Sequence, residues 1–267
     1  MSLYAPLPIR PPPSPLSFDM SYGQQRDCPI IKPAQSPTQD PAHSAAIIFL
    51  HGLDDDAHGW EDIANQFQRA NKLPYLQWIF PNAPHNHDAR QNAWYNPTPL
   101  RATPAGRPEL AEEEDEEGLR KSVAYVESLV DGLCSKGIPT NRIVLAGFSQ
   151  GCALSLLTEL TSRHSGRFAG IAGLMGYLPL PDKIQAMRSE AGLPHVVGEV
   201  PLFLGRGGQD RLIPHTRWDE TVGKLKELGF GSALELKEYP DLGHALSPVV
   251  LQDLLVWLES IVPKLED

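Results

Sequence analysis

Apolar runs and amphipathic stretches alternate along most of the chain. Short runs rich in Ile, Val, Leu and Phe predict buried strands at about residues 45–50, 76–80, 142–146, 168–175, 200–204 and 234–239. Between these runs, apolar residues recur at helical spacing and predict helices at about residues 59–70, 118–135, 152–160, 215–228 and 248–262. A short edge strand is expected at residues 30–32. Strands that alternate with helices favour the α/β class, with a mostly parallel sheet and helices on both faces.

The turn at residues 147–151 lies between a predicted strand and a predicted helix. Its sequence is Gly-Phe-Ser-Gln-Gly, which fits the pattern Gly-x-Ser-x-Gly. In this context the pattern is typical of a nucleophile elbow, in which the glycines permit a sharp turn and the serine is exposed above the positive end of a helix. Ser149 is therefore the predicted nucleophile; the alternative is a plain turn between strand and helix.

A serine hydroxyl needs a base to take its proton, and the base needs an acid that fixes its tautomer. Where such an elbow is used, the acid and then the histidine follow the serine along the chain, each in a loop after a strand. Asp210 and His244 satisfy this order, and parallel strands bring both to the carboxyl edge of the sheet. Asp182 and Asp241 are rival acids, although Asp241 is too close in sequence to His244 to approach its ring easily.

The oxyanion hole is expected to use two backbone N–H groups. One belongs to Gln150, directly after the nucleophile, and the other to Leu53, in the loop after the strand at residues 45–50. Attack by Ser149 would give an acyl-enzyme, which water activated by His244 would hydrolyse. This cycle requires neither a metal ion nor an organic cofactor.

The remaining histidines are weaker candidates. His51 is interpreted as a structural residue of the loop beside the oxyanion hole, and His164 and His195 as surface residues. His85 and His87 have spacing that a metal could use, but no further ligands are evident in the sequence.

Composition narrows the function further. The 267 residues carry a formal net charge of −10, which argues against nucleic-acid partners and anionic membrane surfaces. No apolar run is long enough to span a bilayer, and prolines interrupt the N-terminal region where a signal peptide would need an apolar core. Three cysteines, Cys28, Cys134 and Cys152, have no metal-ligand spacing and suggest reduced thiols in the cytoplasm or also the nucleus.

Residues 1–28 are rich in proline and predict a disordered tail, although the spacing at residues 8–15 would also suit a polyproline II ligand. The folded domain is expected to span residues 29–267. Within it, residues 81–108 predict a long functional loop in which residues 93–95 face the substrate. The acidic run at residues 112–117 is interpreted as a solvated face that complements the positive end of the following helix.

From about residue 29 to its C-terminus, the chain resembles the acyl-protein thioesterase and carboxylesterase family of α/β-hydrolases. The matching pieces lie mostly in loops after strands: Phe-Leu-His-Gly-Leu at 49–53, Asp55, His-Gly-Trp at 58–60, Pro-Asn-Ala-Pro at 81–84, Trp-Tyr at 94–95, Gly-Leu at 118–119, Asn-Arg-Ile at 141–143, Gly-Phe-Ser-Gln-Gly at 147–151, Gly-Tyr-Leu-Pro-Leu at 176–180, Asp-x-x-Ile-Pro at 210–214 and Gly-His at 243–244.

The resemblance implies the α/β-hydrolase fold, a triad of Ser149, Asp210 and His244, and an oxyanion hole formed by the Leu53 and Gln150 N–H groups. It also implies removal of long-chain acyl groups from protein cysteines, or hydrolysis of lysophospholipids and small esters. The partner would be an acylated protein or a small acyl ester, without nucleic acid or stable membrane insertion; a weak homodimer is compatible with this picture.

Three residues are expected to line an acyl groove, namely Trp94, Tyr177 and Leu178, with ordinary packing as the alternative for each. The chain departs from the family pattern at Asp54, where glycine is usual, and at Asn96, where an acid often stands. The segment from 97 to 113 also looks longer than usual. A divergent small-ester carboxylesterase is therefore a second hypothesis, and a non-catalytic binding protein of the same fold is a third.

Overall fold

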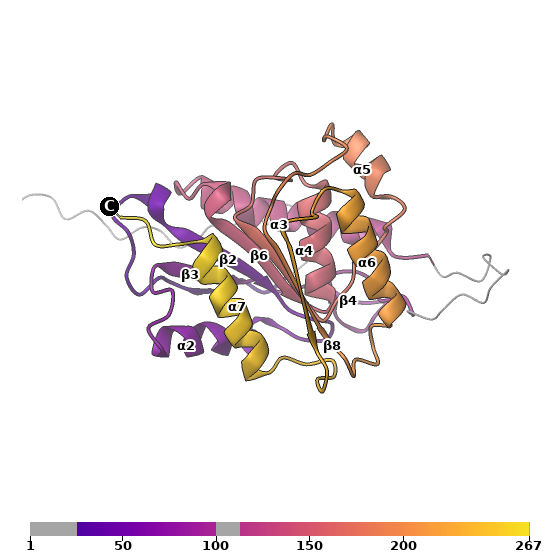
Figure 1. Cartoon of the computed structure of the whole chain (residues 1–267), viewed down its shortest axis with the longest axis horizontal. Helices are drawn as coiled ribbons and strands as arrows, with labels where there is room; N and C mark the ends of the chain where they lie inside the picture. The colour runs from indigo at the N-terminus through magenta and orange to yellow at the C-terminus, as the bar shows by residue number, and fades with distance from the viewer. Residues whose placement is uncertain (1–25, 100–112, 267) are drawn as a thin grey trace, which may run out of the picture.

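The computed structural model describes residues 26–99 and 113–266 (Figure 1). The proline-rich stretch at residues 8–15 lies outside this part of the chain. Residues 26–28, which the sequence assigned to a tail, lie against the folded body: the Arg26 guanidinium is 4.1 Å from the centre of the Tyr125 ring, and Cys28 O accepts a hydrogen bond from Asn82 Nδ2.

The centre of the fold is a seven-stranded sheet in the order β1-β3-β2-β6-β7-β8-β9. Its strands are Ile30–Lys32 (β1), Leu76–Phe80 (β3), Ala45–Leu50 (β2), Ile143–Phe148 (β6), Gly170–Leu174 (β7), Leu202–Gly207 (β8) and Leu234–Tyr239 (β9). β1 is antiparallel to β3, and the other neighbours in this sheet are parallel. The predicted α/β class with a mostly parallel sheet is confirmed.

Helices cover both faces of the sheet. They are Ala57–Trp60 (α1), Asp62–Arg69 (α2), Glu116–Cys134 (α3), Gln150–Thr161 (α4), Ile184–Glu190 (α5), His215–Glu227 (α6) and Pro248–Ile261 (α7). Side chains of β2 alternate between two cores: Ile47 and Phe49 pack with α1, α2 and α7, whereas Ile48 and Leu50 pack with α3 to α6. The continuous apolar run of β2 is thus explained by burial on both faces.

Three details differ from the sequence-based expectations. The single helix expected at residues 59–70 starts earlier, at Ala57, where the Asp56 side chain caps α1 by accepting from Gly59 N–H. It is also divided, because α1 ends at Trp60 and α2 starts at Asp62. Helix α5 was not predicted, since seven residues are too few for a clear helical period. The long loop contains a small hairpin of His85–Asn86 (β4) and Gln91–Asn92 (β5).

The topology determines where a site can form. β2, β6, β8 and β9 are parallel, so the loops that follow them all emerge at one edge of the sheet. These loops begin at His51, Ser149, Gly208 and Pro240, respectively.

Among the described residues, no helix has the length and apolar character needed to cross a membrane.

Candidate functional site

Ser149 lies on a sharp turn between β6 and α4. Its φ of 55° belongs to a region that residues with a side chain rarely adopt, so the turn is strained. Close backbone approach makes the turn possible: a Cβ on Gly151 would lie 2.0 Å from Leu50 O, and one on Gly147 would lie 2.2 Å from the Gly151 carbonyl. The Ser149 N–H donates to Leu174 O at 2.9 Å, which ties the turn to β7. The predicted strand–turn–helix context of Ser149 is present.

Asp210 and His244 form a hydrogen-bonded pair across two loops. His244 Nδ1 lies 2.7 Å from Asp210 Oδ2, and the Asp210 carboxylate also accepts from the N–H groups of Leu212 and Ile213, at 2.8 and 3.0 Å. Burial alone would raise the pKa of Asp210, but these hydrogen bonds outweigh it and hold the pKa below its ordinary value. An ionised Asp210 favours the tautomer in which His244 carries its proton on Nδ1, leaving Nε2 as a base.

Ser149 and His244 line the same pocket, which has a volume of about 410 Å³. Its walls come from the loops after β2, β6, β7, β8 and β9 and from residues 95–98 of the long loop. The lining residues are Gly52, Leu53, Asp55, Tyr95, Pro97, Thr98, Phe148, Ser149, Gln150, Tyr177, Leu212, Ile213 and His244. Most of this surface is apolar, so the pocket suits an acyl group next to the serine.

A second, larger cavity of about 730 Å³ includes Trp94 and Tyr95 among its lining residues. Charged and amide side chains line it, including Arg26, Asp88 and Lys121, and Ser149 is not among its lining residues. Ser149 and His244, which is hydrogen-bonded to Asp210, line only the smaller, apolar pocket of these two.

The three residues expected to line an acyl groove are placed differently from one another. Tyr177 lines the pocket. Trp94 and Leu178 do not: each is 2% exposed and packs in the core. The Trp94 indole N–H donates to His51 O at 2.9 Å, and the Leu178 N–H donates to Thr221 Oγ1 at 2.8 Å. For these two residues the packing alternative fits the structure.

A chain of hydrogen bonds closes one side of the pocket. The hydroxyl of Tyr177 donates to Glu114 Oε1 at 2.8 Å, and Tyr95 lines the same pocket. The second oxygen of Glu114 accepts from Leu180 N–H at 2.7 Å. Burial, assisted by the Glu114 charge, raises the pKa of both phenols, so they stay neutral at physiological pH.

The loop after β2 runs beside the elbow and carries Leu53. Asp54 has a φ of 61°, a left-handed conformation that favours glycine, and its N–H donates to Asn92 O at 2.8 Å. The Asn92 amide also donates to Asp55 O at 3.2 Å. The hairpin therefore braces this loop, and Asp54 adopts a conformation that the family's usual glycine reaches without strain.

Gln150 has two separable roles in the site geometry. It is the first residue of α4, where a backbone N–H has no acceptor within the helix. Its side chain accepts from Trp94 N–H at 3.1 Å and donates to Tyr95 O at 3.1 Å. The sequence predicted a role only for the backbone N–H of Gln150, and nothing in it indicated the two hydrogen bonds of the side-chain amide.

Two residues of the acidic run at 112–117 make specific hydrogen bonds near the pocket, in addition to forming a solvent-exposed face. Glu114 holds the pocket wall, and Asp115 caps α3 by accepting from Gly118 N–H at 2.9 Å while its other oxygen accepts from Asn96 N–H at 2.8 Å. Asn96, the residue after Trp94-Tyr95, is therefore hydrogen-bonded to an acid from another part of the chain, Asp115. Asp115 directly precedes the helix and lies three residues before Gly118, so this cap could have been predicted from the sequence.

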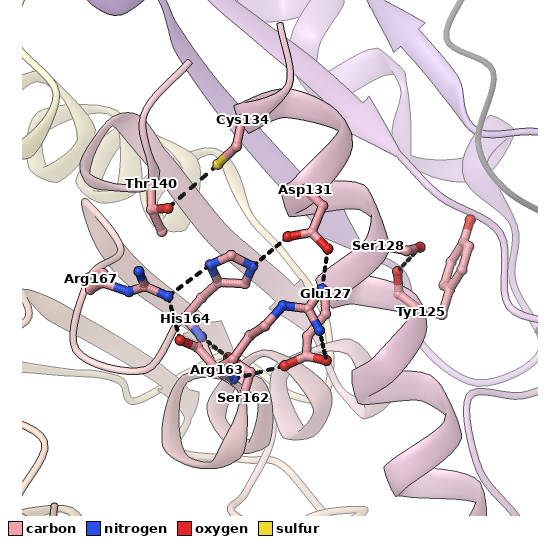
Figure 2. A network of polar contacts seen from close by, with 10 residues as sticks. All are labelled: Tyr125, Glu127, Ser128, Asp131, Cys134, Thr140, Ser162, Arg163, His164 and Arg167. Atoms are coloured by element: carbon pink, nitrogen blue, oxygen red, sulfur yellow. Dashed lines mark hydrogen bonds and ion pairs between the residues drawn. The ribbon is translucent and has the colours of Figure 1, made fainter. Parts of the chain in front are cut away.

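Two histidines outside the acid–base pair are buried. His51 is 1% exposed and structural in its contacts, as expected. His164 was expected on the surface but is 6% exposed; its Nε2 lies 2.9 Å from Asp131 Oδ1 in a network that joins α3 to the end of α4 (Figure 2). His85 and His87 stack edge to face on the hairpin, and the described residues contain no group of three His, Cys, Asp or Glu side chains suited to a metal ion.

Comparison with known proteins shows which family the chain belongs to. The sequence profile of the phospholipase/carboxylesterase family matches residues 33–262. Acyl-protein thioesterase 1 of Yarrowia lipolytica is 35% identical over 229 residues, covering 82% of this chain and 92% of the relative. Acyl-protein thioesterase 1 of Emericella nidulans is 33% identical over 244 residues, covering 88% and 95%.

Solved structures share the fold. A Zea mays acyl-protein thioesterase 2 superposes with a TM-score of 0.69 at 24% identity, covering 88% of this chain and 98% of that protein. Arabidopsis thaliana SOBER1 superposes with a TM-score of 0.68 at 26% identity, covering 82% and 99%. The chain therefore belongs to the phospholipase/carboxylesterase family of α/β-hydrolases and is a hydrolase of ester or thioester bonds.

Proposed function

We propose that this protein is a serine hydrolase of the acyl-protein thioesterase type, which removes acyl groups from cysteine side chains of proteins. Ser149 is the nucleophile, His244 the general base and Asp210 the residue that orients His244. The observation that carries the proposal is the 2.7 Å contact between His244 and Asp210 at the pocket lined by Ser149.

In the proposed cycle, His244 Nε2 takes the hydroxyl proton as Ser149 attacks the acyl carbonyl. The oxyanion is stabilised by the N–H groups of Leu53 and Gln150. The thiolate leaves, taking the proton from His244, and water activated by His244 then hydrolyses the acyl-enzyme. A cysteine thiol has a pKa of roughly 8.5, so its thiolate needs little assistance from an acid as it leaves.

Several features support an acylated protein as the substrate. The pocket is mostly apolar, and its rim includes Leu212, whose side chain is 65% exposed beside the acid–base pair. Relatives that match more than four fifths of the chain are acyl-protein thioesterases. The three free cysteines fit the proposed location in the cytoplasm or nucleus, where acylated cytosolic proteins occur.

The alternative, a carboxylesterase of small esters, is supported by the phenols of Tyr95 and Tyr177, which place polar groups beside a pocket of about 410 Å³. Comparison of kcat/KM for long-chain acyl thioesters, short-chain thioesters and p-nitrophenyl esters distinguishes the two activities. A preference for short oxygen esters would remove the thioesterase assignment.

The proposed chemistry is tested by labelling with a fluorophosphonate probe. We expect labelling of the wild-type protein and none of Ser149→Ala. Equal labelling of both proteins, or no labelling of either, would contradict the proposal, and the latter result would favour a non-catalytic binding protein.

A further inference from the structure

We infer that His51 is a positioning residue of the oxyanion hole, which orients the peptide group that carries the Leu53 N–H. The inference rests on the proposed function, because Leu53 is an oxyanion donor only if Ser149 attacks an acyl carbonyl. It gives His51 a mechanistic role through the backbone, with no contact between its ring and the substrate.

The decisive contact joins the His51 ring to the carbonyl of the next residue. His51 Nδ1 lies 2.7 Å from Gly52 O. The carbonyl of Gly52 and the N–H of Leu53 belong to one planar trans peptide, in which the two groups point in opposite directions. A hydrogen bond that holds Gly52 O therefore also fixes the direction in which the Leu53 N–H points.

The opposite side of the ring fixes its tautomer. The Ala83 N–H donates to His51 Nε2 at 3.0 Å, so Nε2 is an acceptor and the proton of the neutral ring lies on Nδ1. Burial lowers the pKa of His51, although the Gly52 carbonyl and the carboxylates of Asp55 and Asp56 act in the other direction. The neutral ring is thus held as a donor toward Gly52.

The peptide oriented in this way lies against the nucleophile. A Cβ on Gly52 would be 3.4 Å from Ser149 Cβ and 3.2 Å from the Phe148 ring, and Gly52, Leu53 and Ser149 all line the pocket. Within the described residues, the Leu53 N–H donates no hydrogen bond to the protein. A directed but unused donor beside Ser149 is what oxyanion stabilisation requires.

Other contacts hold the ring but do not orient the donor. Trp94 packs on the ring with centroids 5.0 Å apart, and its indole N–H holds His51 O. Replacing His51 by any amide removes its ring contact with Trp94, so this loss is common to the two amide variants. Two amides that replace different ring nitrogens therefore test those nitrogens separately.

Asparagine and glutamine substitute for the two nitrogens in turn. The shorter His51→Asn amide reaches the place of Nδ1 and can still donate to Gly52 O, whereas the longer His51→Gln amide reaches the place of Nε2 and can still accept from Ala83 N–H. We expect H51Q to lower kcat about 30- to 100-fold with little change in KM, since one oxyanion donor is worth roughly 10²–10³ in kcat. H51N should stay within about threefold of the wild type, because that donor keeps its direction.

The matched control uses the other buried histidine. H164N and H164Q alter a ring that is also held by hydrogen bonds, to Asp131 and Arg167, but lies in the network between α3 and α4 (Figure 2). Both control variants should keep the wild-type kcat whatever their effect on thermal stability. Equal losses of kcat in H51N and H51Q, or a larger loss in H51N, would overturn the inference.

A measurement on the wild-type protein covers the case in which the His51 variants do not fold. Two-bond ¹H–¹⁵N correlation of the imidazoles, with His51 assigned through its backbone, should show the Nδ1-protonated tautomer. The Nε2-protonated tautomer would overturn the inference. Failure of the inference leaves an active wild type that is labelled at Ser149, whereas failure of the proposed function leaves an unlabelled one.

Discussion

Asp210→Asn is the substitution for which the structure predicts the most specific defect. The carboxylate uses Oδ1 to accept from the N–H groups of Leu212 and Ile213, and Oδ2 to face His244. An asparagine at 210 keeps its carbonyl oxygen toward the two backbone donors, because its NH₂ group cannot accept from them. The NH₂ group is then turned toward His244 Nδ1.

The consequence is a change of tautomer at His244. Nδ1 must accept from the new amide, so the ring proton moves to Nε2, where the base for Ser149 is needed. The same change in a serine protease triad lowers kcat about 10⁴-fold. We expect a similar loss here, which corresponds to about 5.4 kcal/mol in the activation barrier. The backbone hydrogen bonds of the loop remain, so thermal stability should change much less than activity.

The assay is steady-state hydrolysis of a p-nitrophenyl ester and an acyl thioester near pH 8, with thermal unfolding as the control for folding. An Asp241→Asn variant is the matched control, since Asp241 is exposed and lies three residues before His244 in the same loop. A folded Asp210→Asn protein with less than about a tenfold loss of kcat would refute the tautomer argument.

Three further predictions concern the loop, the elbow and the core. Asp54→Gly should raise the free energy of unfolding by about 0.5–1 kcal/mol in chemical denaturation, because glycine adopts the φ of 61° without strain; destabilisation would contradict this. Gly176→Ala should lower both the free energy of unfolding and kcat, since its Cβ would lie 2.5 Å from Cys152 Cβ and 2.8 Å from Ser149 O and would displace the turn at Ser149. An unchanged kcat would contradict this prediction. Burial raises the pKa of Glu159 to about 8, so the folded state binds its proton more tightly than the unfolded state does. Stability should therefore fall as pH rises from about 4.3 toward 8. Glu159→Gln, measured by denaturation at both ends of this range, should remove a loss on the order of 5 kcal/mol, and an unchanged pH slope would contradict this.

The sheet could be predicted from the sequence because its strands bury both faces. Ala45–Leu50 reads as a continuous apolar run and is buried throughout, so its bounds were predicted correctly. Once the strands are parallel, the loops after them share an edge, which is why Ser149, Asp210 and His244 could be placed at one edge of the sheet from their order along the chain.

The walls of the pocket could not be predicted in the same way. Whether Trp94 faces the pocket or the core depends on the Gln150 amide and on His51 O, which are far away in sequence. The role of Glu114 likewise depends on a contact with Tyr177 across 63 residues. Such contacts leave no periodic signal in the sequence, so residues that shape substrate preference are harder to infer than those that carry the chemistry.

The central claim, that Ser149 becomes acylated, is tested most directly by mass spectrometry of the trapped intermediate. The wild-type protein is mixed with a long-chain acyl thioester, quenched in acid within one turnover and digested. We predict the mass of the acyl group on the peptide that contains Ser149, and none on that peptide from Ser149→Ala. An acyl group on a different residue, or turnover of the thioester by Ser149→Ala at the wild-type rate, would contradict the account.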